Sequence, residues 1–209
     1  DRYPNLKEYL DVVALGTIGD IAPLVGENRI FAKIGLELIT EGKRPGIRAL
    51  KEASGVDGQL IDSFKASFCL IPRINAAGRI ASALDAVELL LAESMEEARP
   101  LAEKLDLYNR RRQAMERDIL NDILERLKAR PDLENINALV FSSEKWHPGV
   151  VGIVASRLVD LYSRPAFVIS VKDGVGKGSG RSVSDFNIHK GLQQCASLLL
   201  SYGGHYRAA

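Results

Sequence analysis

The sequence predicts an α/β protein with a mostly helical first part, one long connecting helix and a small mixed α/β second part. Apolar residues recur at helical spacing through residues 1–92. An apolar seam of the same period then continues for about 34 residues. After Pro131, short apolar runs alternate with helical patterns, which is typical of strands and helices layered in one small domain.

The first part holds several candidate helices. Residues 10–24 contain a short β-branched run followed by glycines, which fits either a buried strand or a helix end that runs into a turn. Residues 28–42 have apolar residues one turn apart and end in Gly42, a common helix stop. Residues 46–54 form a second short candidate.

Two more helices are expected before the long one. Residues 57–68 have an apolar stripe, and residues 81–91 have another. The residues expected to face inward are Leu60, Ile61, Phe64 and Phe68 in the first stripe, and Leu84, Val87, Leu90 and Leu91 in the second.

The long helix begins at a capping-box pattern formed by Ser94 and Glu97. It should reach about Lys128, roughly 50 Å at 1.5 Å per residue, and we interpret it as a connector between two lobes. Pro100 is expected to kink its first turns, and Arg112 occupies a seam position that should be apolar. The seam itself comprises Ala98, Leu101, Leu105, Tyr108, Met115, Ile119, Ile123 and Leu127.

The second part alternates between the two periods. Strands are predicted at residues 138–142 and 166–171, and a glycine-rich strand or loop at residues 176–183. Helices are predicted at residues 150–162 and 187–200. The first of these helices should point Ile153, Val154, Leu158 and Leu161 inward, and the second should be capped by Asp185 or Asn187.

The composition excludes several classes of protein. The formal charge is +1, and no apolar run approaches the roughly 18–20 residues of a membrane span. The only two cysteines, Cys69 and Cys195, are far apart and belong to no CxxC pair, so a disulfide scaffold or zinc finger is not indicated. We find no signal peptide and expect a cytosolic protein. The basic run 110–112 is interpreted as a solvated face, whereas the basic segment 170–209 is a candidate to face an anion.

Two candidate sites lie in the first part. Asp20 sits in an apolar stretch beside a turn, so its carboxylate should be paired, cap a helix or turn, or bind a metal. In the string PRINAAGR, small residues around Asn75 and the two arginines Arg73 and Arg79 allow close approach to a phosphate. The alternative for this string is a loop between helices with solvated arginines.

Three candidate anion sites lie in the second part. Residues 146–152 join a strand to a helix N-terminus, which attracts anions, although packing of Trp146 in a simple turn is the favoured interpretation. Residues 176–182 let the backbone approach an anion, or form a flexible hairpin, and lack the order of a Walker loop. The pair Gly203-Gly204 places His205 on a tight turn. The donors of the middle segment are Lys177, Ser179, Arg181 and Ser182.

Five strings, in this order, resemble the RecJ-type single-strand exonucleases of the DHH phosphoesterase superfamily: VALGTIGDIAPL, PRINAAGRI, WHPGVVGIVASRLV, GSGRS and GGHYRAA. The resemblance implies a catalytic domain that holds two divalent ions, a DHH-associated domain, and substrate in the cleft between them. It divides the chain into a remnant of the catalytic domain (1–92), a long connecting helix (93–130) and a C-terminally truncated DHH-associated domain (131–209).

The resemblance also implies roles for individual residues. Asp20 matches an aspartate that binds metal in the catalytic centre, and His205 matches a catalytic histidine near the scissile phosphate. The residues expected to bind substrate phosphate or nucleic acid are Ser179, Arg181, Ser182, Asn75 and Arg79.

The other metal-binding motifs of the superfamily are absent, since no DxD and no HH occurs in the chain. Asp20 alone cannot hold two Mn²⁺ or Mg²⁺ ions, because hard divalent ions need several ligands. We therefore expect a C-terminal piece of a larger enzyme that is inactive alone, retains no metal and exposes apolar surface around residues 12–24.

For the intact protein the resemblance implies a cytoplasmic, metal-dependent 5′-to-3′ exonuclease that acts on single-stranded DNA. It would serve DNA recombination and repair, with other proteins of those processes as possible partners and no membrane. Two alternatives remain open: a DHH phosphoesterase for short oligonucleotides or cyclic dinucleotides, and a non-catalytic nucleic-acid-binding module.

Overall fold

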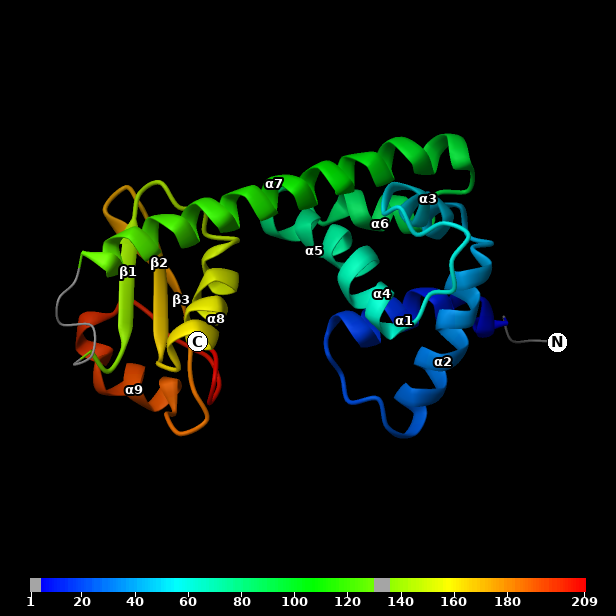
Figure 1. Cartoon of the computed structure of the whole chain (residues 1–209). Coiled ribbons are helices and arrows are strands. Elements are labelled where there is room, and N and C mark those ends of the chain that lie inside the picture. Colours follow the sequence, from blue (N-terminus) through cyan, green and yellow to red (C-terminus); the bar gives the residue numbers. More distant parts are fainter. Residues whose placement is uncertain (1–4, 130–135) are drawn as a thin grey trace. The chain divides into compact units, whose positions relative to one another are not determined.

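The computed structural model describes residues 5–129 and 136–209. Contacts divide the chain into two compact units, Asp1–Arg111 and Arg112–Ala209, which are described separately below. The predicted fold class is confirmed: the first unit is helical, and the second combines helices with a small mixed sheet (Figure 1).

The first unit is built from short helices. In chain order these are η1 (Leu6–Tyr9), α1 (Leu10–Gly19), α2 (Gly26–Glu41), α3 (Pro45–Ala53), α4 (Ser63–Lys65), a π-helical turn η2 (Ala66–Leu70), α5 (Ile71–Ile80), α6 (Leu84–Leu91) and the first turns of α7 (Met95–Lys128). The ambiguous segment 10–24 is therefore mainly a helix. The helices predicted at 28–42 and 46–54 are confirmed, and Gly42 ends α2 in the left-handed conformation with φ 66°.

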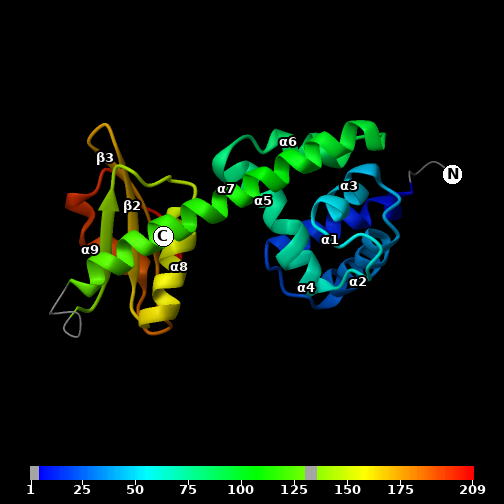
Figure 2. The same ribbon diagram turned by 45° about the horizontal axis from the view of Figure 1, so that its top comes forward.

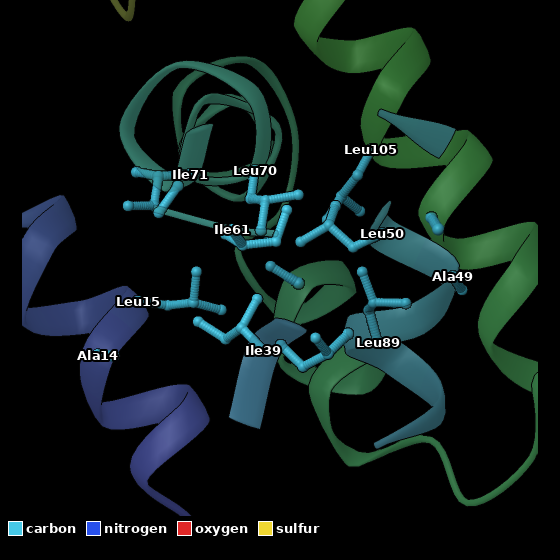
Figure 3. Packing of buried hydrophobic residues seen from close by; sticks show 14 of the residues in the cluster. Ala14, Leu15, Ile39, Ala49, Leu50, Ile61, Leu70, Ile71, Leu89 and Leu105 are labelled. Atoms are coloured by element: carbon cyan, nitrogen blue, oxygen red, sulfur yellow. The ribbon is translucent and has the colours of Figure 1, made fainter. Parts of the chain in front are cut away.

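A single apolar cluster holds these helices together. Leu15 of α1, Ile39 of α2 and Leu50 of α3 converge on it (Figure 3). Leu89 of α6 and Leu105 of α7 complete the cluster, and both are fully buried. Burying a leucine side chain contributes about 1.5–3 kcal/mol, so this cluster is the main source of stability for the first unit.

The expectation of one helix over 57–68 is wrong. Gly58 adopts φ 70°, and the helix begins only at Ser63, where the Asp62 carboxylate accepts a hydrogen bond of 2.8 Å from the Lys65 N–H. The late start moves most of the predicted stripe outward: Leu60, Phe64 and Phe68 are 66–72% exposed, and only Ile61 is buried. The alternative that PRINAAGR is a loop is also wrong, because these residues lie in α5.

The inward face predicted for 81–91 is wrong as well. Helix α6 buries Asp85, Ala86 and Leu89; of the predicted stripe only Leu90 packs against the core, whereas Leu84, Val87 and Leu91 are exposed. The reason is polar: the Asp85 carboxylate accepts hydrogen bonds from Lys104 (2.8 Å) and Tyr108 (3.0 Å) of α7. These two bonds are compatible only with an orientation of α6 in which Asp85 lies against α7.

This contact makes the stability of the first unit sensitive to acid. The hydrogen bond from Lys104 holds the pKa of the Asp85 carboxyl below its ordinary value of 3.8. A depressed folded-state pKa contributes stability that is complete above the unfolded-state value and is lost as the pH falls through the folded-state value. We expect Asp85→Asn to lower the free energy of unfolding at pH 7. Between pH 5 and pH 3, the free energy of unfolding should decrease less in the variant than in the parent, as measured by urea titrations followed by circular dichroism. An unchanged acid limb in this variant would contradict the assignment.

Helix α7 is continuous from Met95 to Lys128 and runs through Pro100 (Figures 1 and 2). The predicted cap is confirmed, because Ser94 Oγ accepts a hydrogen bond of 3.2 Å from the Glu97 N–H. The solvated face predicted for 110–112 is wrong for Arg112, whose side chain is only 13% exposed and pairs with Glu116 at 2.7 Å. This ion pair explains how an arginine occupies a seam position. The predicted seam includes buried Ala98, Leu105, Ile119, Ile123 and Leu127.

The second unit is a three-stranded sheet with helices. It comprises the last turns of α7, β1 (Leu139–Ser143), α8 (Val151–Tyr162), β2 (Ala166–Lys172), β3 (Val175–Arg181), α9 (Ile188–Gln194) and η4 (Ala196–Leu198). The strand order is β1-β2-β3, with β1 and β2 parallel and β2 and β3 antiparallel. Helix α8 is the crossover that a parallel pair requires, and it packs against β2 and β3.

Two details of the second unit differ from expectation. Leu161 is 59% exposed, because the buried face of α8 is formed by Val151, Val154, Ala155 and Leu158. Helix α9 is capped by Asn187, one of the two residues predicted for that role, but it ends at Gln194. The predicted continuation to residue 200 is not helical packing against a core, because Leu198 and Leu200 are 84% and 91% exposed.

No helix in the described ranges has the length and apolar character needed to cross a membrane. Apolar side chains are nevertheless exposed where the sequence analysis expected them, at the turn after α1: Ile21 is 89% exposed and Leu24 is 39% exposed.

Candidate metal ligand and nucleic-acid interface

Asp20 and Asn75 meet in the first unit. Asp20 is the C-terminal cap of α1, where its N–H donates to the carbonyls of Gly16 and Ile18. Its carboxylate is exposed, and no hydrogen bond or ion pair to it is found within the described residues. Asp20 and Asn75 line one pocket of about 320 Å³ between α1 and α5. Arg79 follows Asn75 by one turn on the exposed surface of α5.

The backbone next to Asp20 is strained. Ile21 adopts φ 56°, a left-handed conformation that is a genuine outlier for a β-branched residue. Such strain is found mainly at functional sites, where the surrounding structure imposes it. The strained backbone at Ile21 therefore supports a functional role for Asp20. The residue type and spacing of Asp20 do not support that role by themselves.

These residues fit one ligand of a divalent ion and not a complete site. The Asp20 carboxylate and the Asn75 side-chain carbonyl, which line one pocket, are oxygen donors of the kind that Mg²⁺ and Mn²⁺ prefer. Over residues 5–129 and 136–209, however, no group of three or more His, Cys, Asp or Glu side chains is arranged to hold a metal.

Ser179 and Arg181 form a second site, in the second unit. Both belong to β3, and alternation along a strand places them on the same face. Arg181 Nη1 donates to Ser179 Oγ at 2.8 Å and to the Gly180 carbonyl at 2.9 Å. This geometry holds a guanidinium and a hydroxyl together, as binding of a phosphate oxygen requires.

The first turn of α8 packs closely against Ser179 and Arg181. A Cβ atom on Gly152 would lie 3.0 Å from Ser179 Oγ and 3.3 Å from Arg181 Nη2, so the glycine permits the close approach. The N–H groups at the start of a helix favour an anion, and here they lie beside two side-chain donors. Gly152 was not predicted as a site residue, because nothing in the sequence shows that the first turn of α8 lies against Ser179 and Arg181.

Ser182 and His205 occupy different positions. Ser182 is buried and its hydroxyl donates to the Phe186 carbonyl at 2.7 Å, so the structure does not bring it to Ser179 and Arg181. His205 is exposed, and its backbone N–H donates to the Ala208 carbonyl. The end of the chain pairs with β3, since the Ala209 N–H donates to the Gly180 carbonyl at 3.1 Å. This pairing places the segment of His205 at the edge of the sheet beside the Ser179 site.

Trp146 has the packing role that the sequence analysis weighed against anion binding. It is 5% exposed, its Nε1 donates to Asp122 at 3.1 Å, and the Arg126 guanidinium lies 5.1 Å above its ring. His147 accepts a hydrogen bond from the Gly149 N–H through Nδ1. Both residues line a cavity of about 910 Å³ at the carboxyl ends of β1 and β2.

Comparison with known proteins identifies the relationship. Over 97% of its length, the chain is 41% identical to the single-stranded-DNA-specific exonuclease RecJ of Bacillus subtilis. The chain is homologous to RecJ. The corresponding RecJ of Escherichia coli is 40% identical over 99% of the chain, and residues 135–209 match the DHHA1 domain family. The resemblance inferred from the five strings is thus confirmed.

Solved RecJ structures share the fold. The crystal structure of Thermus thermophilus RecJ in complex with Mn²⁺ matches 98% of the chain with a TM-score of 0.86 and 40% identity. A second crystal structure, of an exonuclease RecJ bound to manganese, matches with a TM-score of 0.83 and 39% identity. The chain spans 26% of the B. subtilis RecJ and 37% of the E. coli RecJ, and 30% and 51% of the two crystallised chains.

Proposed function

We propose that this chain is part of a RecJ-like exonuclease that degrades single-stranded DNA from the 5′ end by metal-dependent hydrolysis of phosphodiester bonds. The observation that carries the proposal is the site where Ser179 and Arg181 meet the first turn of α8 at Gly152. Its donors suit a phosphate, and it lies in the region that matches the DHHA1 domain family. Similarity to RecJ over nearly the whole chain supports DNA as the substrate.

In this proposal each unit has its own task. Arg181 and Ser179 bind a backbone phosphate and set the register of the strand, because phosphate contacts position nucleic acid without reading its sequence. Asp20 contributes one oxygen ligand, and the remaining ligands belong to a longer protein than the chain described. Divalent ions in such enzymes activate a water molecule and stabilise the leaving oxygen.

The other predicted residues have secondary roles. Asn75 shares the pocket of Asp20 and is available to hydrogen-bond substrate there. Arg79, one turn along α5, extends the exposed polar surface towards the nucleic acid. His205 neutralises charge on a phosphate near the bond that is cleaved. Ser182 supports the loop through Phe186 rather than binding phosphate by its hydroxyl.

The proposal includes the setting of the enzyme. We infer a cytoplasmic protein of DNA recombination and repair, with single-stranded DNA as its main partner and other repair proteins as further partners. Cys69 and Cys195 are both free thiols in the structure, which suits a reducing compartment. Mn²⁺ or Mg²⁺ is the proposed cofactor, in keeping with the Mn²⁺ and Mg²⁺ complexes of the Thermus RecJ.

The full-length protein that carries this chain provides the direct test. With saturating Mn²⁺, it should digest a 5′-labelled single strand and release labelled mononucleotides, while a blunt duplex of the same sequence stays intact. Equal digestion of both substrates, or turnover of a dinucleotide alone, would contradict the proposal. The second outcome would favour the alternative of a phosphoesterase for short oligonucleotides.

Replacing Arg181 tests the phosphate site without catalysis. We expect Arg181→Ala in the 209-residue chain to weaken binding of a dT12 strand by about 1–3 kcal/mol, the usual loss for a charge-assisted hydrogen bond. Fluorescence anisotropy at low salt measures this loss. Arg29→Ala is the matched control, since Arg29 is an exposed arginine of α2 with no described partner. Equal affinities for the two variants would remove Arg181 from the site.

A further inference from the structure

The loop between β1 and α8 leads directly to the first turn of α8, and Trp146 anchors this loop. The indole is 5% exposed, and its Nε1–H donates to the Asp122 carboxylate at 3.1 Å. The carbonyl of Trp146 accepts a hydrogen bond of 2.6 Å from the hydroxyl of Ser170, which is buried in β2. One residue of the loop is therefore bonded to both α7 and β2.

Helix α7 supports the indole with an ion pair. Arg126 donates twice to Asp122, through Nε to Oδ1 at 3.0 Å and through Nη2 to Oδ2 at 2.8 Å. The same guanidinium lies 5.1 Å from the centre of the Trp146 ring, and its Nη1 donates to the Ser142 carbonyl at 3.0 Å. The cation–π contact adds to the hydrogen bond of the indole. The ring is thus fixed in position and orientation relative to α7 and the end of β1.

Only five residues separate Trp146 from Gly152, and hydrogen bonds restrict them. The Val150 N–H donates to the His147 carbonyl at 3.1 Å, and the Gly149 N–H donates to His147 Nδ1 at 3.1 Å. Val150 is fully buried, and its carbonyl accepts the first hydrogen bonds of α8. A displacement of Trp146 would therefore be transmitted to the first turn of α8.

The first turn of α8 has a narrow tolerance at the phosphate site. A Cβ atom at Gly152 would lie 3.0 Å from Ser179 Oγ and 3.3 Å from Arg181 Nη2, so a larger residue would meet both side chains. Hydrogen bonds weaken steeply outside their usual distances and angles. A small displacement of α8 would therefore change how its N–H groups and the two side chains converge on one phosphate oxygen.

A packing role alone does not explain the contacts of Trp146. Filling the turn requires only an apolar ring, because the hydrophobic effect has no directional preference. The bond from the indole N–H to a carboxylate fixes a direction as well, since hydrogen bonds to charged groups are strong and geometrically specific. The buried hydroxyl of Ser170 likewise fixes the backbone of Trp146 rather than its ring.

We propose that Trp146 is a positioning residue of the phosphate site. Held by Asp122 and Ser170, it sets the distance between the first turn of α8 and the pair formed by Ser179 and Arg181. Trp146 itself does not contact the nucleic acid. This inference rests on the proposed function and adds to it the residue that holds the phosphate site in its binding geometry.

The test measures binding of a dT12 strand by the 209-residue chain, using fluorescence anisotropy at low salt. Trp146→Phe keeps an aromatic ring and removes the N–H donor, and it should weaken binding about fivefold, roughly the effect of one hydrogen bond. Ser170→Ala removes the other anchor and should weaken binding similarly, so the test does not depend on the folding of one variant. Leu139→Val is the matched control. Leu139 is buried at the opposite end of β1, so its replacement reduces packing without changing the loop, and affinity should stay within about twofold of the parent.

A double-mutant cycle with Gly152→Ala separates positioning from a general loss of stability. The added methyl group should push the first turn of α8 away from Ser179 and Arg181, so this variant alone should weaken dT12 binding. If Trp146 acts through the same turn, adding Trp146→Phe to Gly152→Ala should weaken binding by less than about twofold. Two changes that displace one element are not additive, whereas independent changes are.

The outcomes separate this inference from the proposed function. Additive losses in the cycle, or equal affinities of Trp146→Phe and Leu139→Val, would refute the positioning role. An unchanged affinity of Gly152→Ala would refute it as well, because binding would then not depend on the place of α8. In each of these cases, weaker binding by Arg181→Ala still supports the proposed function. If the chain shows no salt-dependent binding of dT12 at all, both the positioning role and the DNA-binding part of the proposed function are wrong.

Discussion

Replacing Gly35 with alanine is expected to destabilise the first unit by about 3 kcal/mol or more, at the upper end of the cost of overpacking a core. The added methyl group would lie 2.1 Å from the Leu10 carbonyl oxygen and 2.3 Å from Ala14 Cβ. Both contacts are with α1, and the first is with backbone, which cannot rotate away. Helices α1 and α2 would have to separate, and the apolar cluster around Leu15 and Ile39 would loosen.

Urea unfolding followed by two probes measures this effect. Circular dichroism reports the helices, whereas the only tryptophan, Trp146, lies in the second unit and reports on that unit. We expect Gly35→Ala to shift the helical transition to lower urea and to leave the Trp146 transition in place. Gly16→Ala is the matched control: no atom lies within 4 Å of the added methyl, so α1 should gain about 0.5–1 kcal/mol. Equal effects of the two variants would refute the close approach of α1 and α2.

The second large effect is expected at Asp20 in the full-length protein. Asp20→Asn keeps the size of the side chain and removes its charge. If Asp20 is a metal ligand, the Mn²⁺ concentration needed for half-maximal activity should rise at least about tenfold, since even outer-shell partners of a ligand are worth 10–100-fold. The rate at moderate Mn²⁺ should fall by about 100-fold or more, because metal ions supply several kcal/mol of transition-state stabilisation and each 1.36 kcal/mol is tenfold.

Two readouts separate this role from a structural one. Binding of dT12 by the Asp20→Asn variant should stay within about twofold of the parent, since Asp20 belongs to the metal site rather than to the phosphate site. Asp160→Asn, an exposed carboxylate of α8 with no described partner, should change neither rate nor metal dependence. Unchanged Mn²⁺ dependence in Asp20→Asn would overturn the assignment of Asp20 as a ligand.

Long periodic segments were predictable from the sequence. Helix α7 followed from a regular apolar seam, and its start followed from the capping-box pattern of Ser94 and Glu97. The π-helical turn after Ser63 and the inward face of α6 were not predictable. In both places a polar contact accompanies the departure from the apolar stripe: the Asp62 carboxylate caps α4 at Ser63, and the Asp85 carboxylate accepts a hydrogen bond from Lys104.

The candidate site was predictable as a set of residues but not as a geometry. Residue types and glycine spacing indicated Ser179 and Arg181 as donors on a flexible backbone, whereas the metal-ligand role of Asp20 came from the resemblance to the RecJ-type exonucleases. The sequence did not show that Gly152 allows α8 to approach Arg181 closely. It also did not show that the Ser182 hydroxyl donates to the Phe186 carbonyl. Such facts depend on which face of a strand meets which turn of a helix.

By itself the sequence determined the fold class, the order of elements and the kinship with RecJ, since periodicity, caps and motif strings are local properties of the chain. Only the tertiary structure decided that Asp20 and Asn75 share a pocket and that Glu116 gathers Arg112 of α7 and Arg157 of α8. Contacts between distant segments depend on how close-packed helices and strands are rotated against one another. That rotation is set jointly by side chains from several elements, and no single stretch of sequence contains it.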